Sequence, residues 1–318
     1  MIYSKVICTG SYLPNKILTN HDLSNLLDTS DEWISSRTGI KLRHIAEEGV
    51  KTSDLATQAL QNALNYNGTD VLDGIIVATT TPDRIFPATA VKVQKNMGMA
   101  VGFSFDIQAV CSGFLYALQI ADCFIKQGKY TRIAVIGADI MSKIIDWQDR
   151  NTCVLFGDGA GALVLEATHG SVNRGVIATE IYSDGSLFDA LTVSGGLFDK
   201  GSKEKIIMNG REVFKKAVSK MGSSIQKLLK DCKKDIKDID FLLLHQANYR
   251  IIKAVAEKLG ISDDKTLLSV HHHANTSAAS IPLCLDEHMR SGHVPVGSLI
   301  ISAAAGGGFT WGAALFYV

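Results

Sequence analysis

The chain has 318 residues, with 32 Lys and Arg against 32 Asp and Glu, so its formal net charge is zero. That length is enough to bury a full core. The even balance provides no strongly basic surface of the kind that binds nucleic acid. Its six cysteines lie far apart and form no CxxC pair. This spacing argues against a disulfide framework and a structural zinc site, and it favours a reducing, cytoplasmic location.

The first segment, Met1–Ile7, lacks the basic leader and apolar run of a secretory signal, and we expect it to form a strand. Ser298–Val318 carries no charged residue, but its Gly306-Gly307-Gly308 cluster would interrupt a membrane-spanning helix. We therefore expect two core strands joined by a glycine loop here, and no membrane partner.

The first half of the chain is predicted to alternate helices with buried strands. Asp28–Ile34 is typical of a capped helix start, and a basic patch of Arg37, Lys41, Arg43 and His44 follows Trp33. The pattern then predicts a helix over 53–66, a strand over 75–78, a helix over 88–97, a strand ending at 110, a helix from 112 and a strand over 133–137. Short apolar strands alternating with helices indicate parallel strands covered on both faces.

The second half repeats this order, with strands over 241–244, 267–270 and 299–302 and helices over 249–259 and 277–289. Cys111 follows Thr80, at the end of a first-half strand, by 31 positions, and Asn275 follows His245 by 30. We interpret the repeat as a duplicated α/β unit with halves 1–170 and 171–318. Because strand carboxyl ends face a shared crevice in such folds, Cys111, His245 and Asn275 are expected to converge.

Cys111 lies where a strand is predicted to turn into a helix. The first N–H groups of that helix and its dipole favour the thiolate, so we expect a lowered pKa and a nucleophilic sulfur. Such a thiol can hold an acyl group as a thioester, while His245 and Asn275 donate hydrogen bonds to the carbonyl oxygen of a second thioester. Loss of carbon dioxide from a malonyl unit would then give an enolate that attacks the acyl group. This chemistry needs no metal or redox cofactor.

Six stretches resemble the β-ketoacyl-(acyl carrier protein) synthase III family, the initiating condensing enzymes of bacterial fatty acid synthesis. They are residues 29–34, 37–40, 156–162, 245–248, 275–280 and 306–312. The resemblance implies a thiolase-like α/β fold in which two duplicated halves form an α-β-α-β-α core. It also implies a homodimer that condenses an acyl-coenzyme A primer, expected to be acetyl-coenzyme A, with malonyl-(acyl carrier protein).

The resemblance also implies roles for individual positions. Cys111 carries the acyl intermediate, and His245 and Asn275 serve the decarboxylation step. Trp33 stacks on the adenine of coenzyme A, with Arg37 and Arg150 holding the adenine and phosphate end. The other implied substrate contacts are Thr29, Phe86, Arg211, Phe214, Ala247, Ala305 and Gly306. Phe86 would cross a dimer interface and bound the partner's acyl pocket. The implied carrier-protein contacts are Gln246, Arg250, Lys215 and Lys258.

Three positions depart from the family pattern. Ala305 replaces the Phe that usually precedes the Gly-Gly-Gly loop, Ala274 replaces the Gly that usually precedes the Asn, and Arg211 stands where some members have Asn. The missing aromatic wall at Ala305 suggests a larger acyl chain or a different second substrate. Two alternatives therefore stay open: a condensing enzyme or acyltransferase of secondary metabolism, making an alkylquinolone or polyketide starter, and a catalytically silent relative.

The run His271-His272-His273 resembles a metal site by composition alone. This segment is predicted to continue a strand, and adjacent side chains of a strand point to opposite faces. The three imidazoles would then not chelate one ion, and we expect no metal site here.

Overall fold

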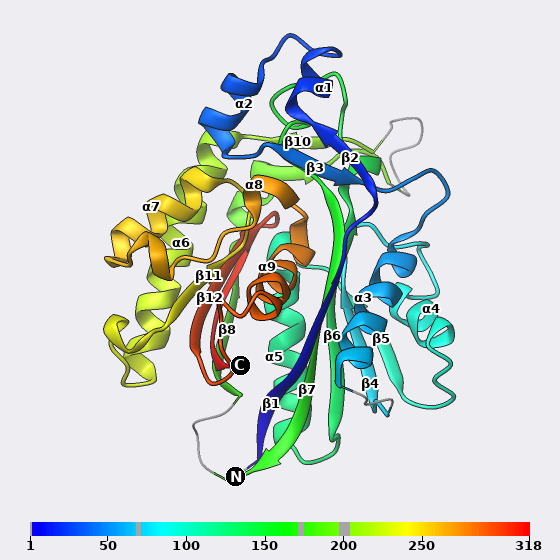
Figure 1. The fold of residues 1–318 in the computed structure, drawn as a ribbon, viewed down its shortest axis with the longest axis vertical. Helices are drawn as coiled ribbons and strands as arrows, with labels where there is room; N and C mark the ends of the chain where they lie inside the picture. The colour runs from blue at the N-terminus through cyan, green and yellow to red at the C-terminus, as the bar shows by residue number, and fades with distance from the viewer. Residues whose placement is uncertain (1, 68–70, 171–174, 197–203) are drawn as a thin grey trace.

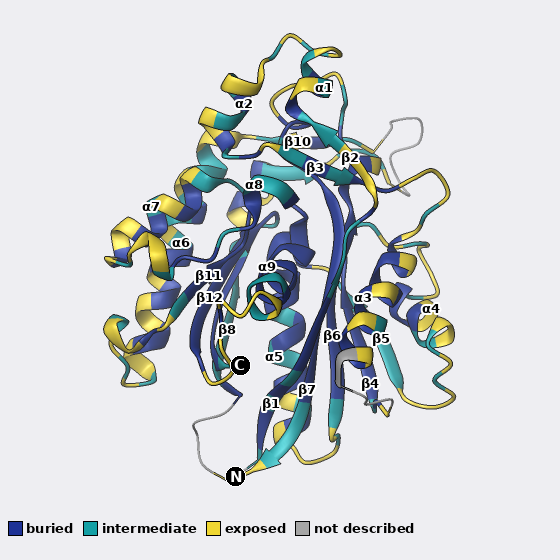
Figure 2. Ribbon diagram, viewed as in Figure 1, coloured by how far each residue is buried: buried dark blue, intermediate teal, exposed yellow. Residues whose placement is uncertain are grey.

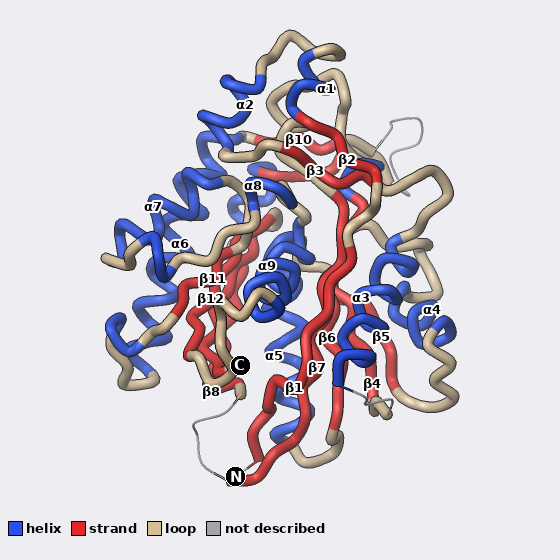
Figure 3. Tube along the Cα trace, viewed as in Figure 1, coloured by secondary structure: helices blue, strands red, loops and turns tan. Residues whose placement is uncertain are grey.

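Two β-sheets, with helices between them and on both outer faces, form the body of the protein (Figure 1). This computed structural model describes all residues except 1, 68–70, 171–174 and 197–203. The layers follow the α-β-α-β-α order expected from the sequence. Figure 3 shows the alternation of helices and strands that produces these layers.

The first sheet has the strand order β1-β7-β6-β4-β5. Its strands are β1 (Ile2–Tyr12), β7 (Asp158–His169), β6 (Arg132–Ile140), β4 (Gly74–Ala78) and β5 (Phe103–Ile107). β4 runs parallel to both β5 and β6, whereas β7 is antiparallel to both β1 and β6. The sheet is thus mixed, and only its β6-β4-β5 part matches the expected parallel arrangement. Every residue of β4 is buried, as in a strand covered on both faces.

The second sheet repeats this order. Its strands are β8 (Val176–Ser183), β13 (Thr310–Tyr317), β12 (Leu299–Gly306) and β11 (Phe241–Leu244). In the order β8-β13-β12-β11 they match β1-β7-β6-β4, with β11 and β12 parallel. The strand predicted over 267–270 does not form among the described residues: one bridge, Leu242 to Thr266, precedes it, and α8 begins at Val270. The division of the chain at about residue 170 stays a prediction, and residues 171–174 lie outside the described part.

Helices fill the space between the sheets and cover their outer faces (Figure 1). α5 (Gly113–Lys126) and α9 (Ser280–Arg290) lie between the two sheets. α3 (Thr52–Asn67) and α4 (Thr89–Asn96) cover the first sheet, and α6 (Gly210–Asp231) and α7 (Tyr249–Leu259) cover the second. Figure 2 shows the strands mostly buried and the outer helices exposed along one side. The central α5 has apolar residues around most of its surface because both sheets pack against it.

A cap of short elements lies at one end of the sheets, at the top of Figure 1. It contains β2 (Lys16–Thr19), α1 (Asn20–Ser24), α2 (Asp31–Thr38), β3 (Leu42–Ile45), β9 (Leu191–Val193) and β10 (Ile206–Met208). α2 begins where the Ser30 hydroxyl accepts a hydrogen bond from the Trp33 N–H, at 3.1 Å. The capped helix start predicted from the sequence therefore forms, three residues later than its first predicted residue.

Arg43 is fully buried, so it does not belong to the surface basic patch predicted beside Trp33. Its guanidinium donates to the Asn20 side-chain oxygen (2.9 Å) and to the backbone oxygens of Val154 (3.0 Å) and Leu18 (3.2 Å). Burial lowers the pKa of Arg43 to about 10. Arg43 therefore joins β3 to neighbouring parts of the cap.

Ser298–Val318 contains β12 and β13, which pair antiparallel across the glycine turn, as predicted. Among the described residues, no helix combines the length and apolarity needed to cross a membrane.

Candidate active site

Cys111 lies in a short 3₁₀ turn, Val110–Ser112, between β5 and α5. β5 ends at Ile107 and α5 begins at Gly113, so the strand is shorter than predicted. Val110 has a φ of 48°, which a β-branched residue rarely adopts, and the chain turns sharply just before the cysteine. Gly306 approaches this turn so closely that a Cβ there would lie 2.8 Å from the Cys111 nitrogen. Only glycine at 306 lets the end of β12 reach the nucleophile.

His245 directly follows β11, and its backbone N–H donates to the Ala303 oxygen at 2.9 Å. Its Nδ1 lies 2.6 Å from the Ser280 hydroxyl at the start of α9. Burial lowers the pKa of the His245 imidazole to about 3, so the ring is neutral at physiological pH. Because Ser280 occupies Nδ1, Nε2 is the ring nitrogen available to a substrate.

Three hydrogen bonds to backbone groups fix the position of Asn275. Its N–H donates to the Leu155 oxygen (2.9 Å), and its carbonyl accepts from the Gly157 N–H (3.0 Å). Its side-chain oxygen accepts from the Ser277 N–H at 2.9 Å. With the oxygen fixed in this way, the side-chain NH₂ is the group that can donate to a substrate.

Cys111, His245 and Asn275 line one cavity of about 670 Å³. The first comes from one half of the duplicated fold and the other two come from the second half. Eight further residues singled out from the sequence line the same cavity: Trp33, Arg37, Arg211, Phe214, Ala247, Arg250, Ala305 and Gly306. The cavity thus joins the three reactive side chains to an aromatic ring and several cations.

Trp33 and Arg37, which line this cavity, form a cluster with Arg150, which is not among its lining residues. The guanidinium carbons of Arg37 and Arg150 lie 4.8 Å and 5.3 Å from the centre of the Trp33 ring. Arg150 is exposed and also donates to the backbone oxygen of Asp28. Thr29, next to Asp28, does not line the cavity, and its buried hydroxyl has no hydrogen-bond partner.

Gln246 is fully buried and does not fit the carrier-protein contact inferred from the sequence. Its side-chain nitrogen donates to the backbone oxygens of Leu244 (2.7 Å) and Leu267 (3.2 Å). Its side-chain oxygen accepts from the N–H groups of Ser269 (2.9 Å) and Val270 (3.1 Å). Gln246 therefore holds the segment that leads to Asn275 against β11. The other three inferred contacts, Arg250, Lys215 and Lys258, are exposed on α6 and α7.

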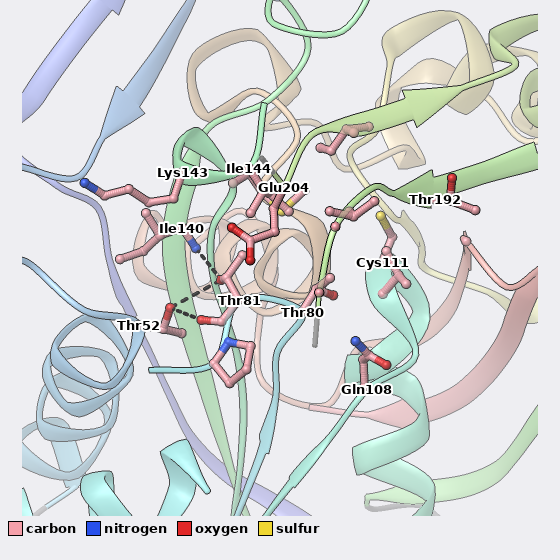
Figure 4. A pocket seen from close by; sticks show the side chains of 18 of the residues that line it. Thr52, Thr80, Thr81, Gln108, Cys111, Ile140, Lys143, Ile144, Thr192 and Glu204 are labelled. Carbon is pink, nitrogen blue, oxygen red and sulfur yellow. Dashed lines mark hydrogen bonds between the residues drawn. The ribbon is translucent and has the colours of Figure 1, made fainter. Parts of the chain in front are cut away.

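A second cavity, of about 840 Å³, also reaches Cys111 (Figure 4). Figure 4 shows Cys111 at the start of α5, with Thr80, Thr81 and Thr192 among the residues around this cavity. Ile85 lines it and is 72% exposed, and the adjacent Phe86, which is not among the lining residues, is 81% exposed. Cys111 therefore has a cavity on each of two sides, and one of them lies next to an exposed apolar loop.

Asp139, Ser277 and Ser280 were not identified from the sequence. The fully buried carboxylate of Asp139 accepts from the N–H groups of Thr80 (2.7 Å) and Ala278 (3.2 Å). It thereby connects the end of β4 to the segment after Asn275, and burial raises its pKa. The sequence does contain one signal for Asp139. This acidic residue lies inside the apolar run 133–140, where a buried carboxylate needs hydrogen-bond partners.

The expectation of a low Cys111 pKa is wrong for the ligand-free protein. The pKa of this thiol is raised to about 12, mainly by burial and also by the nearby Asp139 carboxylate, and the Ser277 hydroxyl offsets only part of the increase. The local helix N-terminus favours the thiolate, but the second half of the fold covers the side chain, and the loss of water around it outweighs this effect.

We expect Cys111 to react slowly with iodoacetamide near neutral pH. Its alkylation rate should rise about tenfold per pH unit between pH 7 and pH 9, because the thiolate fraction grows in that proportion below the pKa. Peptide mapping by mass spectrometry separates Cys111 from the exposed Cys123. A rate that levels off below pH 8 would show that the thiol is acidic after all.

Ala274 adopts a backbone conformation suited to glycine. Its φ is 58° and its ψ is −160°, in a region where L side chains are strained by about 1–3 kcal/mol. We expect Ala274→Gly to raise the free energy of unfolding by about 1 kcal/mol, since relief of strain exceeds the entropic cost of glycine.

Denaturant unfolding measures this change. Ala256→Gly, in the interior of α7, is the matched control and should lower the free energy of unfolding by about 1 kcal/mol. Equal destabilisation by both substitutions would refute strain at Ala274.

Comparison with known proteins reveals similarity along the whole chain. The family model described as 3-oxoacyl-(acyl-carrier-protein) synthase III matches residues 105–185, and the model of its C-terminal part matches residues 229–318. The chain is 51% identical to the β-ketoacyl-(acyl-carrier-protein) synthase III of Paramagnetospirillum magneticum, and the match covers 99% of each chain.

Solved structures show the same similarity. The 3-oxoacyl-(acyl-carrier-protein) synthase III of Aquifex aeolicus superposes with a TM-score of 0.93 at 46% identity, covering 99% of this chain and 100% of that one. A priming β-ketosynthase from the R1128 polyketide biosynthetic pathway gives a TM-score of 0.94 at 30% identity, covering 99% of this chain and 96% of that one. The segments matched by the family models include Cys111, His245 and Asn275.

Proposed function

Since the chain belongs to the 3-oxoacyl-(acyl-carrier-protein) synthase III family, we propose that Cys111, His245 and Asn275 perform the two steps of its reaction. The chain is a condensing enzyme of the acyltransferase type, and the reaction starts fatty acid synthesis. The observation that carries the assignment is that the three side chains line one cavity. That cavity also contains groups suited to a nucleotide-bearing thioester.

The first step transfers an acyl group from coenzyme A to Cys111. Sγ attacks the thioester carbonyl, the bond from that carbon to the coenzyme A sulfur breaks, and the Sγ proton goes to the departing sulfur. Because burial raises the pKa of Cys111, loss of its proton must be assisted during this step. Trp33 supplies a ring on which adenine can stack, and Arg37 and Arg150 supply charge for the phosphates.

The second step uses His245 and Asn275 as hydrogen-bond donors. With the Ser280 hydroxyl donating to Nδ1, the neutral His245 ring carries its proton on Nε2 and can donate it, as Asn275 can donate its NH₂. Both stabilise the enolate oxygen left when malonyl-(acyl carrier protein) loses carbon dioxide. The enolate carbon attacks the acyl carbon, the bond to Sγ breaks with its electron pair on sulfur, and the Cys111 thiolate takes a proton from water. No metal or redox cofactor takes part in this scheme.

Acetyl-coenzyme A is the proposed primer, and Ala305 widens the site enough for a longer one. Ala305 lines the cavity that holds the reactive groups, at the position where the family usually has Phe. In a mixture of acetyl-, butyryl- and octanoyl-coenzyme A, mass spectrometry should find both acetyl and butyryl groups on Cys111. Ala305→Phe should reduce the butyryl product and keep the acetyl one. Strict acetyl preference in the unmodified protein would contradict the wider site without contradicting the condensation.

The acyl carrier protein, which is acidic, is proposed to bind at Arg250, Lys215 and Lys258. Arg250 lines the cavity, and the two lysines are exposed on the neighbouring helices α6 and α7. We expect Arg250→Glu to raise KM for malonyl-(acyl carrier protein) about tenfold, by weakening electrostatic attraction. KM for malonyl-coenzyme A, which has no protein surface, should change far less. Lys237→Glu, outside this patch, is the control, and an equal effect of Arg250→Glu on both substrates would contradict the assignment.

The protein is proposed to be a cytoplasmic homodimer. The exposed apolar side chains of Ile85, Phe86 and Val101 support an interface, and Phe86 adjoins the second cavity that reaches Cys111. The cytoplasm is supported by the six cysteines, which form no disulfide. Light scattering tests the dimer, and Phe86→Asp should shift it toward the monomer. A monomeric unmodified protein would overturn this part.

A role in secondary metabolism is the second candidate, because Ala305 departs from the family and a polyketide-priming enzyme has a closely similar fold. Product analysis with malonyl-coenzyme A against malonyl-(acyl carrier protein) separates the two candidates. A protein that takes no acetyl group from acetyl-coenzyme A would instead be a silent relative.

A further inference from the structure

His272, His273 and Glu287 form a cluster outside both cavities that reach Cys111. The two histidines end the short helix α8 (Val270–His273), and Glu287 lies on α9. Their candidate ligand atoms all lie within 4.8 Å of one another. The expectation of a strand here was wrong, and so was the argument that neighbouring histidines must point apart. On the helical turn, both Nε2 atoms face Glu287, at 2.9 Å for His272 and 3.6 Å for His273.

A structural ion pair does not account for His273. Its side chain is only 8% exposed, and its buried Nδ1 has no hydrogen-bond partner among the residues that the structure describes. Its Nε2 lies 3.6 Å from the Glu287 carboxylate, which is longer than a hydrogen bond. A neutral imidazole and a carboxylate are the forms that metal ions bind.

The ligand types select the class of ion. Two imidazole nitrogens and one carboxylate oxygen suit zinc and related transition-metal ions, whereas calcium and magnesium prefer oxygen ligands. The side chains of His272 and Glu287 are 43% and 38% exposed, which leaves solvent access for a water as fourth ligand. Ligand atoms of a tetrahedral zinc site lie about 3.3 Å apart, so small side-chain rotations suffice. We propose that His272, His273 and Glu287 bind one divalent transition-metal ion of the zinc type.

The position of this site connects it to the catalytic segment. His273 is separated from Asn275 only by the strained Ala274, and Ser280, which contacts His245, begins the helix that carries Glu287. α8 precedes the turn that holds Asn275, and α9 follows it. A bound ion would therefore link the two helices that flank this turn. It should raise thermal stability by binding only the folded chain.

Titration calorimetry of the full chain with zinc chloride tests the proposal, with cobalt absorption as a second readout of the ligand type. Because thiols also bind zinc, the decisive quantity is the difference between the unmodified protein and the variants His272→Ala and Glu287→Gln. We expect each variant to weaken binding at this site at least about 100-fold and to abolish the zinc-induced rise in Tm. His293→Ala, an exposed histidine outside the cluster, is the control and should bind as the unmodified protein does.

Circular dichroism verifies that each variant is folded. If one variant is unfolded, the other variant alone decides the result. Equal affinity and stoichiometry in the unmodified protein and a folded variant would overturn the proposal. Absence of zinc-dependent stabilisation in the unmodified protein would do the same. Neither result would affect the proposed condensation, whose test measures acyl transfer and not metal binding.

Discussion

Cys111→Ala is expected to abolish acyl transfer from acyl-coenzyme A, with a loss of at least about 10,000-fold, because among the described residues no other cysteine lines either cavity. Intact-protein mass spectrometry after incubation with acetyl-coenzyme A measures the loss directly. Cys123→Ala is the matched control, since Cys123 is an exposed thiol on α5, the helix that follows Cys111, and lines neither cavity.

The control variant should gain one acetyl group, as the unmodified protein should. Acetylation that persists in Cys111→Ala, or disappears in Cys123→Ala, would place the acyl intermediate on another residue.

His245→Ala and Asn275→Ala are expected to separate the two steps. Each should leave acyl transfer to Cys111 nearly intact and reduce condensation about 100- to 1,000-fold, because each removes one donor to the enolate oxygen. Acylation is followed by protein mass, and condensation is followed by release of carbon dioxide from malonyl-(acyl carrier protein). The double variant should lose less than the product of the two single effects, since the donors act on one oxygen.

His293→Ala, an exposed histidine that lines neither cavity, should condense at the unmodified rate. If His245→Ala also blocked acylation, the imidazole would have a role in the first step that its neutral, buried state does not suggest.

The sequence predicted best those elements whose signals are local. The apolar run of β11 ends where His245 begins, and Asn248 caps α7 through a 2.8 Å bond to the Arg250 N–H, so both elements have the predicted bounds. The repeated spacing around Cys111 and Asn275 likewise indicated which strand ends share a crevice.

Predictions failed where distant residues decide the local structure. Residues 267–270 have the composition of a strand, but the Gln246 side chain binds the N–H groups of Ser269 and Val270, and α8 begins there. Arg43 was assigned to the surface because its partner Val154 lies 111 positions away. The Cys111 pKa was misjudged for the same reason, since its burial depends on the second half of the fold.

The central claim is that one sulfur accepts the acyl group and then gives it up to a carbon nucleophile formed beside His245 and Asn275. The most direct test follows the mass of the unmodified chain in two stages, first with acetyl-coenzyme A and then with malonyl-(acyl carrier protein). We expect one acetyl group mapped to Cys111, which disappears in the second stage as 3-oxoacyl carrier protein forms. An acetyl group that maps elsewhere, or remains on Cys111 after the malonyl substrate is added, would contradict it.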